Sequence, residues 1–210
     1  MKARIMFVAG TLGAMMSSAA FAQEPGAAAG DAAVPKLSVA AQVEMLPTGS
    51  GKTTVNGASM SQDTAVAYGV TAMFDYAINP YLSVGVAPRL VLNVKPSDAA
   101  AGVDANRELD LRARIAGHLP VRPGLDVYAA AMPGYSIVMS SQDGVNSATG
   151  FALAGALGAT YNVTPNMFVG AEVGYQRAFT SQDQTVLGQK VSADLDLSYM
   201  HVGIAAGTRF

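Results

Sequence analysis

Hydrophobic and polar residues alternate one by one along most of the chain after residue 36. Eight segments carry this alternation: residues 37–45, 65–76, 81–94, 108–119, 125–139, 149–162, 167–179 and 191–210. Because successive side chains of a β-strand point to opposite faces, each segment predicts a strand with one apolar face and one small or polar face. We therefore expect an all-β protein.

Two prolines and one change of parity disturb this pattern. Pro88 and Pro133 lie within the third and fifth segments. Since proline cannot donate a ladder hydrogen bond, we expect a bulge at Pro88 and a break at Pro133. In the last segment, Leu195 and Leu197 have the opposite parity to the apolar residues that follow. This predicts a further bulge at residues 198–199.

The connections between the segments alternate strictly in length. Long polar connections span residues 47–64, 95–107, 140–148 and 180–190, and tight ones span residues 77–80, 120–124 and 163–166. In antiparallel strands this places all long loops at one end. Such a layout is typical of membrane barrels, so we predict an eight-stranded antiparallel up-and-down transmembrane β-barrel over residues 37–210.

Charged residues indicate which face of the strands looks inward. Those with the parity opposite to the large aliphatic side chains are Glu44, Asp75, Arg89, Asp110, Arg112, Arg114 and Glu172. A soluble ligand-binding barrel would have the reverse polarity. We expect the aliphatic side chains to face lipid and the charged ones to pair in the narrow interior of an eight-stranded barrel. This network is either a static filling or a gate on an aqueous path.

Composition limits the partners and sites. Charged residues make up 13% of the chain, against about 25% in a typical soluble domain. The net charge of −2 gives no reason to expect a nucleic-acid partner. The absence of cysteine excludes thiolate sites, and two histidines are too few for a multi-histidine metal cluster. We expect neither a metal nor a cofactor.

The first 36 residues do not share the alternation. Residues 1–22 contain Lys2 and Arg4, an apolar run and an Ala-Phe-Ala cleavage pattern, which predict a signal peptide. An uncleaved membrane anchor is the alternative. Residues 23–36 are rich in Ala, Gly and Pro and predict a flexible periplasmic lead-in.

Aromatic residues gather toward the two ends of the predicted strands. Those toward the long loops are Tyr68, Tyr135, Phe151, Tyr175 and Phe179, and those toward the tight turns are Phe74, Tyr76, Tyr81, Tyr161 and Phe210. Belts at membrane interfaces have this distribution, although strands are rich in aromatic residues anyway. Arg177 has outward parity near the loop end. We expect its head to reach lipopolysaccharide phosphates, or its strand to extend above the membrane.

Residues 46–54 are similar to the phosphate-binding loop of nucleotide-binding proteins, because they include Gly-Ser-Gly-Lys-Thr-Thr. That loop requires glycine where this chain has Leu46, and a helix after the lysine, which residues 55–59 do not favour. We therefore expect no nucleotide here and interpret the stretch as part of the first mobile surface loop.

The chain ends on the aromatic Phe210. With the leader, the strand count and the alternating connections, it resembles the small eight-stranded bacterial outer-membrane β-barrel family, which includes OmpX-like proteins and the OmpA barrel domain. The resemblance implies a monomer in the cell outer membrane, surrounded by lipid and lipopolysaccharide. It also implies insertion by the outer-membrane assembly machinery, with Phe210 and the last strand as the signal.

The resemblance leaves three functions open, because such barrels serve different tasks. The first hypothesis is a non-enzymatic envelope protein that is structural or acts through its long loops on an unspecified partner. A narrow solute or ion pore is the second. The third is a lipid A-modifying enzyme. One type of such enzyme is identified by a His-x-Ser arrangement with a distant carboxylate. His201 is followed by Val202 and Gly203, which do not match, so we expect His118 and His201 to line the interior as hydrogen-bonded polar residues.

Overall fold

The computed structural model describes residues 36–99, 104–141, 145–186 and 189–210. In these ranges the strands are β1 (Leu37–Val55), β2 (Ala58–Asp63), β3 (Ala67–Asn79), β4 (Leu82–Val86), β5 (Arg89–Val94), β6 (Asn106–Arg122), β7 (Leu125–Met139), β8 (Ala148–Asn162), β9 (Met167–Val186) and β10 (Gln189–Arg209). No helix within them is long and apolar enough to cross a membrane. The expected signal peptide and residues 23–35 of the lead-in lie outside the described residues.

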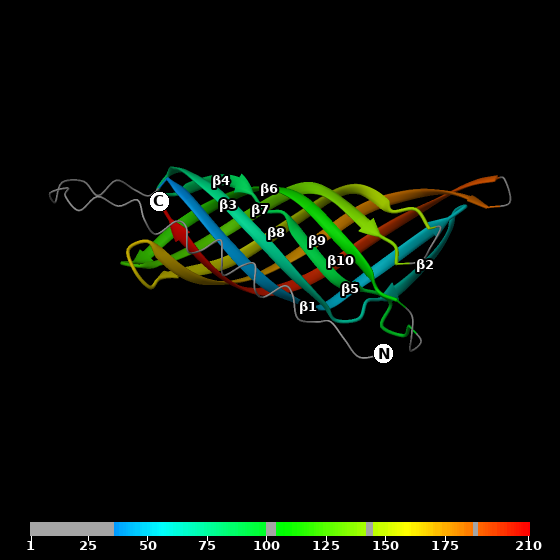
Figure 1. Ribbon diagram of the computed structural model, residues 1–210, viewed down its shortest axis with the longest axis horizontal. Coiled ribbons are helices and arrows are strands. Elements are labelled where there is room, and N and C mark those ends of the chain that lie inside the picture. Colours follow the sequence, from blue (N-terminus) through cyan, green and yellow to red (C-terminus); the bar gives the residue numbers. More distant parts are fainter. Residues whose placement is uncertain (1–35, 100–103, 142–144, 187–188) are drawn as a thin grey trace. The chain divides into compact units, whose positions relative to one another are not determined.

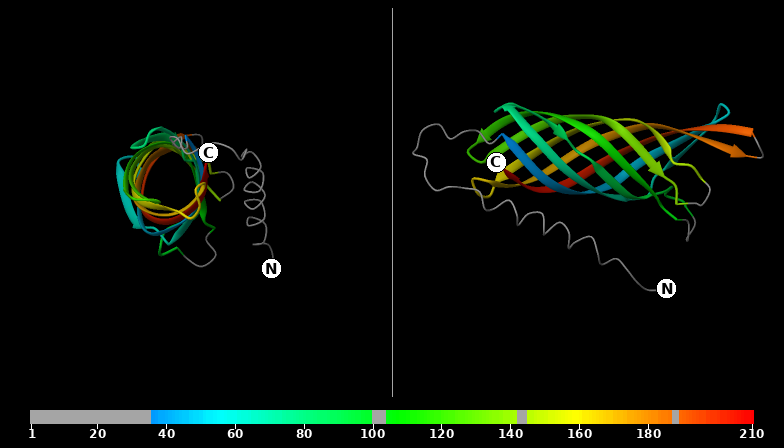
Figure 2. Two further views of the ribbon diagram at one scale, coloured as in Figure 1. Left: turned by 90° about the vertical axis from the view of Figure 1, so that its left-hand side faces the viewer. Right: turned by 45° about the horizontal axis from the view of Figure 1, so that its top comes forward.

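The strands close into a ring (Figure 1). From β1 the order runs through β10, β9, β8, β7 and β6, then through β4 and β5 to β3, which pairs with β1. β4 and β5 are two halves of one strand, since both keep the same register against β3 and against β6. The ring therefore has eight antiparallel strands, as predicted, and Figure 2 shows it end-on.

Neither internal proline has the expected effect. At Pro88 the third strand is interrupted, but its register does not slip. β7 runs through Pro133 as a single strand. The register shift of the third strand lies instead near Asn93, which adopts a φ of 67°. Asparagine tolerates this left-handed conformation, and the shift turns Val94 into the interior although its parity predicted an outward side chain.

The bulge expected at residues 198–199 is also wrong. β10 keeps one register against β9 throughout their pairing. The shift between β1 and β10 lies on β1, between Met45 and Thr48. Leu197 and Tyr199 therefore keep the parity of the inward residues that follow, and both are buried in the barrel.

Two of the four expected loops are largely strand. β1 continues through the first loop region and turns back at Asn56 and Gly57, both with positive φ, into β2. β9 and β10 likewise continue beyond the ring. Residues 50–55 of β1 thus pair with residues 58–63 of β2 and with residues 193–198 of β10, and residues 189–194 of β10 pair with residues 181–186 of β9. We call this sheet at the loop end the crest (Figure 1). The three tight turns, residues 80–81, 123–124 and 163–166, overlap the predicted connections, but the first two are shorter than predicted because β3 and β6 extend into them.

The barrel is apolar outside and polar inside. Large aliphatic residues of the wall are about half exposed: Leu111 52%, Ile115 49% and Val173 45%. Their charged neighbours are almost fully buried: Arg112 4%, Arg114 3% and Glu172 6%. This distribution suits a surface covered by lipid and confirms the predicted polarity of the strands.

Candidate functional site

A cluster of charged side chains occupies the middle of the barrel. The guanidinium of Arg89 on β5 lies 2.8 Å from Asp110 Oδ2 on β6 and 3.4 Å from Glu44 Oε2 on β1. The hydroxyl of Thr71, on β3, donates to the same glutamate. Four neighbouring strands thus supply groups that satisfy one another, as buried charges require.

Arg112 and Gln176 extend this cluster across the barrel. Arg112 Nε donates to the carbonyl of Ala87 at 3.1 Å, and its Nη1 donates to Gln176 Oε1 at 3.3 Å. The amide nitrogen of Gln176, on β9, donates to Glu108 Oε1 at 3.1 Å and Asp110 Oδ2 at 3.0 Å. Side chains from distant strands therefore meet on the barrel axis.

Glu172 is the centre of a second cluster. Its Oε2 accepts a hydrogen bond from the Tyr128 hydroxyl at 2.9 Å, and its Oε1 lies 3.2 Å from His201 Nε2. Gln42 Nε2 donates to Oε1 at 3.3 Å. His201 is thus a buried hydrogen-bonded residue of the interior, in agreement with its predicted place.

Asp75 and Arg114 form a separate pair, with Nη1 and Oδ2 2.5 Å apart. The guanidinium of Arg114 also lies 5.0 Å from the centre of the Tyr128 ring. The structure thus places all seven charged residues inside the barrel, but in three groups: Glu44, Arg89, Asp110 and Arg112; Glu172 with His201; and Asp75 with Arg114.

Buried apolar side chains fill the interior at the loop end. The cluster comprises Leu46, Ala67, Val91, Val94, Val138, Ala148, Ala152, Ala178, Leu197 and Tyr199. Leu197 and Tyr199 point inward into this apolar part of the interior. The alternation predicts a polar interior throughout, and against that expectation inward apolar side chains at these positions indicate a change of parity. The described part of the barrel is therefore packed at this level.

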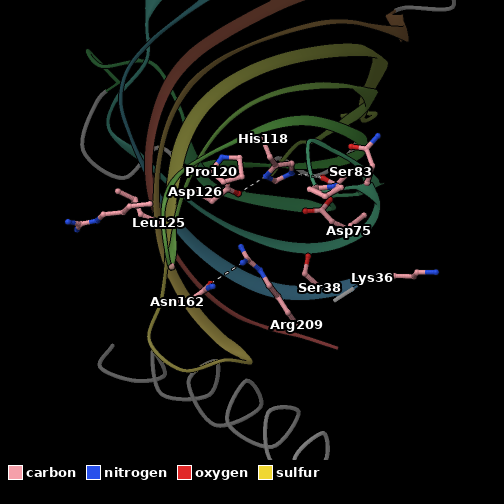
Figure 3. Close-up of a pocket in the computed structure, with 15 residues that line it drawn as sticks. Lys36, Ser38, Asp75, Ser83, His118, Pro120, Leu125, Asp126, Asn162 and Arg209 are labelled. Carbon is pink, nitrogen blue, oxygen red and sulfur yellow. Dashed lines mark hydrogen bonds and ion pairs between the residues drawn. The ribbon is translucent and has the colours of Figure 1, made fainter. Parts of the chain in front are cut away.

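The turn end, in contrast, contains a cavity of about 270 Å³. Ser83 Oγ lies 2.9 Å from His118 Nε2, and His118 Nδ1 lies 2.7 Å from Asp126 Oδ2, so the three groups line its wall in one chain (Figure 3). Arg209 enters from β10, on the far side of the ring, and donates to Asn162 Oδ1 at 2.9 Å. His118 is hydrogen-bonded in the interior, as expected, but it also joins a serine and an aspartate.

Several members of these clusters were missed by the sequence pattern. Glu108, Gln42, Gln176 and Tyr128 all take part in hydrogen bonds of the interior. The inward parity of Glu108 and Gln176 was visible, because each alternates with outward aliphatic neighbours. Parity does not tell which inward residues meet, since this depends on the relative shift of strands around the ring.

The sequence matches one family model, described as "Outer membrane protein beta-barrel domain", over residues 7–210. The chain belongs to the outer-membrane β-barrel family. Accordingly it is a protein of the outer membrane of Gram-negative bacteria, and in this family the tight turns face the periplasm. We call the turn end the periplasmic end from here on.

Solved structures share the fold of this outer-membrane barrel at low sequence identity. The outer membrane protein OprG from Pseudomonas aeruginosa is 15% identical, with a TM-score of 0.61 over 84% of this chain and 96% of that one. Neisserial surface protein A is 16% identical, with a TM-score of 0.50 over 82% of this chain and 97% of that one. At such identities the likeness concerns the fold alone. No curated protein matches the sequence.

The stretch similar to a phosphate-binding loop is a strand of the outer-membrane barrel. Lys52 and Thr53 lie in β1, opposite Asp196 and Leu195 of β10 and opposite Ser61 and Met60 of β2. A phosphate-binding loop needs free backbone amides before a helix, whereas here the backbone pairs on both sides. The interpretation of this stretch as a mobile loop is therefore wrong. Among the described residues, no three His, Asp or Glu side chains are grouped to hold a metal ion.

Proposed function

We propose that the protein is a non-conducting component of the outer-membrane envelope whose loop end acts by contact. The observation that carries this proposal is the filled interior. Leu46, Val91 and Tyr199 are buried at the loop end, and below them Arg89 and Asp110 are fully enclosed. A continuous water path would require these side chains to move apart, so the packing supports an envelope role over a pore.

The crest supports action by contact. β2 is exposed along its whole length and lies at the edge of the sheet, paired with the outer part of β1. An exposed strand edge offers backbone groups to a partner. In this proposal the ring anchors the crest in the membrane, and the crest meets components at the cell surface.

The outer wall near the loop end carries an ion pair that fits the level of lipopolysaccharide headgroups. Arg177 Nη2 lies 2.5 Å from Asp196 Oδ2, and the guanidinium lies 4.7 Å from the centre of the Phe179 ring. Arg177 is already paired with Asp196. Its expected contact with lipopolysaccharide phosphates therefore requires Arg177 to exchange the aspartate for a phosphate. We propose that the barrel is a monomer surrounded by lipid and lipopolysaccharide.

Planar-bilayer recordings test the absence of conduction. The purified barrel, shown to be folded by its heat-modifiable migration on unboiled gels, is expected to give no conductance steps. Steps that change in Arg112→Ala or Glu172→Ala would support the narrow pore instead and remove the non-conducting role.

Shortening the crest tests action by contact. Replacement of residues 53–60 with Asn-Gly keeps a two-residue hairpin between β1 and β2 and leaves the ring intact. Cells that lack the protein are compared for detergent sensitivity after they receive the full chain or this variant. If only the full chain restores resistance while both fold, the crest is required; equal restoration by both assigns the role to the ring alone.

A further inference from the structure

Ser83, His118 and Asp126 lie on three strands that are neighbours in the ring, β4, β6 and β7. The hydroxyl of Ser83 is 2.9 Å from His118 Nε2, and Asp126 Oδ2 is 2.7 Å from His118 Nδ1. Both distances are within the reach of a hydrogen bond. Nucleophile, base and orienting carboxylate thus stand in the order that serine hydrolases use, on a rigid sheet.

The hydrogen-bond partners assign the protons of this chain. An ionised carboxylate only accepts hydrogen bonds, so Asp126 requires the proton of a neutral imidazole to be on His118 Nδ1. Nε2 is then unprotonated and accepts from the hydroxyl of Ser83. The Tyr128 ring lies beside the imidazole, with the two ring centres 5.9 Å apart. In this tautomer His118 is ready to remove the serine proton.

The cavity beside Ser83 supplies space and positive charge. Lys36, Arg122 and Arg209 line it together with the acids Asp75 and Asp126. Both acids already have partners, because Asp75 pairs with Arg114 and Asp126 pairs with His118. Because the backbone amides of the wall serve the strand ladders, stabilisation of a developing oxyanion has to come from side chains. Figure 3 shows Arg209 extending into the same space as Ser83 and His118.

We propose that this cavity is a hydrolytic site for small carboxylic esters that carry a negative charge. Ser83 is the nucleophile, His118 is the general base and acid, and Asp126 is a positioning residue. The cationic groups of the lining attract the anionic substrate and its transition state. This activity goes beyond the proposed function, which concerns the opposite end of the barrel.

The reaction requires only water as a co-reactant. Ser83 Oγ bonds to the carbonyl carbon of the ester while His118 Nε2 takes the hydroxyl proton. The bond from that carbon to the alcohol oxygen then breaks, and His118 returns the proton to the leaving alcohol. Water attacks the acyl-serine, gives one proton to His118, and frees the carboxylic acid as this proton returns to Ser83 Oγ. Ester and water thus become acid and alcohol.

Fluorophosphonate labelling of the folded full chain in detergent micelles tests the nucleophile, because this probe bonds to activated serines. We expect one adduct, located on Ser83 by mass spectrometry, and none in Ser83→Ala. His118→Asn is expected to slow labelling by about 100-fold, the scale of general-base catalysis. Ser61→Ala, which removes a serine of the exposed strand β2, serves as the matched control and is expected to label at the wild-type rate.

Two results would overturn the proposal. The first is a folded wild-type barrel that forms no adduct, which would make the three residues a structural hydrogen-bond chain. The second is labelling that persists in Ser83→Ala or is unaffected by His118→Asn. Heat-modifiable migration of each variant shows that the comparison is made between folded proteins.

Asp126→Asn tests the positioning role. An amide in place of the carboxylate no longer requires the proton on Nδ1, so the imidazole loses its preferred tautomer. We expect the ¹⁵N signals of His118 to shift toward the other tautomer, with at least about 100-fold slower labelling in the same sample. A changed tautomer with an unchanged labelling rate contradicts the role.

Matched esters test the substrate class. The barrel is expected to hydrolyse p-nitrophenyl hydrogen succinate faster than p-nitrophenyl butyrate, which has the same number of acyl carbons but no charge. Arg209→Gln should slow hydrolysis of both esters, because Arg209 stabilises the oxyanion, and it should slow the succinate ester more, because the attraction for the substrate's own charge is lost as well. Faster hydrolysis of the neutral ester by the wild type would refute the assigned anionic substrate.

Discussion

Arg89 and Asp110 occupy directly opposed positions on β5 and β6, with guanidinium and carboxylate 2.8 Å apart and neither side chain exposed. Removal of one partner leaves the other charge buried and unpaired. We therefore expect Arg89→Met to lower the free energy of unfolding by about 3–5 kcal/mol. Urea titration of the barrel in phospholipid vesicles, followed by the fraction that migrates as folded on unboiled gels, measures this loss.

The pair formed by Arg177 and Asp196 provides the control for this prediction. It lies on the outer wall, where the side chain of Arg177 is 52% exposed. Arg177→Met should therefore cost clearly less than Arg89→Met, because solvent screens the charge that remains. A double variant, Arg89→Met with Asp110→Leu, should recover part of the stability, since it also removes the unpaired charge of Asp110 and leaves only Glu44 without its arginine. Equal losses in the two single variants would contradict the enclosed position of Arg89.

Gly174 is required by the close approach of His201. A methyl group added at this glycine would lie 2.6 Å from His201 Nε2 and 2.6 Å from the carbonyl oxygen of Gly155. Gly174→Ala should thus displace the imidazole from Glu172 and lower the urea midpoint of the barrel. Gly117→Ala is the matched control, because nothing lies within 4 Å of its added methyl group. We expect it to leave the midpoint unchanged, and equal effects would disprove the steric explanation.

Much of the barrel was predictable because each strand has one face toward lipid and one toward the axis. This constraint makes parity informative, and it placed Arg112 and Glu172 inside and Ile115 outside. The same argument failed for Val94, because a single residue in the left-handed conformation, Asn93, reverses the parity beyond it. The alternation of hydrophobic and polar residues does not predict such a reversal.

The assignment of inward and outward positions also relied on a polar interior along the whole barrel. Leu197 and Tyr199 have inward parity but are apolar, since the interior at the loop end is a hydrophobic core. The crest was missed for a related reason. Residues 47–55 are polar and rich in glycine, so they look like a loop, although residues 50–55 pair on both sides with β2 and β10.

The hydrogen-bond chain of Ser83, His118 and Asp126 could not be predicted from the sequence, and the reason is geometric. Along the sequence the serine and histidine are 35 positions apart, and only the register between β4 and β6 brings them together. Ser83 lies opposite Ala116, so His118 is its diagonal neighbour on the same face. The register of these strands had to be known before the contact could be seen.

Phe210 joins the closing strand to the first one. Its backbone N–H donates to the carbonyl of Leu37 at 2.8 Å, and the N–H of Leu37 donates back at 3.3 Å. If its side chain is the signal for the assembly machinery, Phe210→Ala should reduce the amount of folded protein in the outer membrane in cells. Refolding of the purified variant into detergent should remain near normal. Phe151→Ala, an outward aromatic residue on β8, is the control; an equal loss in both variants would assign the effect to general stability.

Ile115 tests the lipid-facing wall most directly. Its side chain points outward and is 49% exposed, and it lies near the middle of β6, between the loop end and the periplasmic end of the strand. Arginine at the middle of the hydrocarbon layer costs about 2–4 kcal/mol, whereas near the interface it costs about 0–1 kcal/mol. We therefore expect Ile115→Arg to lower the free energy of unfolding in vesicles by the larger amount and Val121→Arg, near the end of the same strand, by the smaller. If Val121→Arg were the more damaging of the two, the depth assigned to these residues, and with it the placement of the barrel in the membrane, would be wrong.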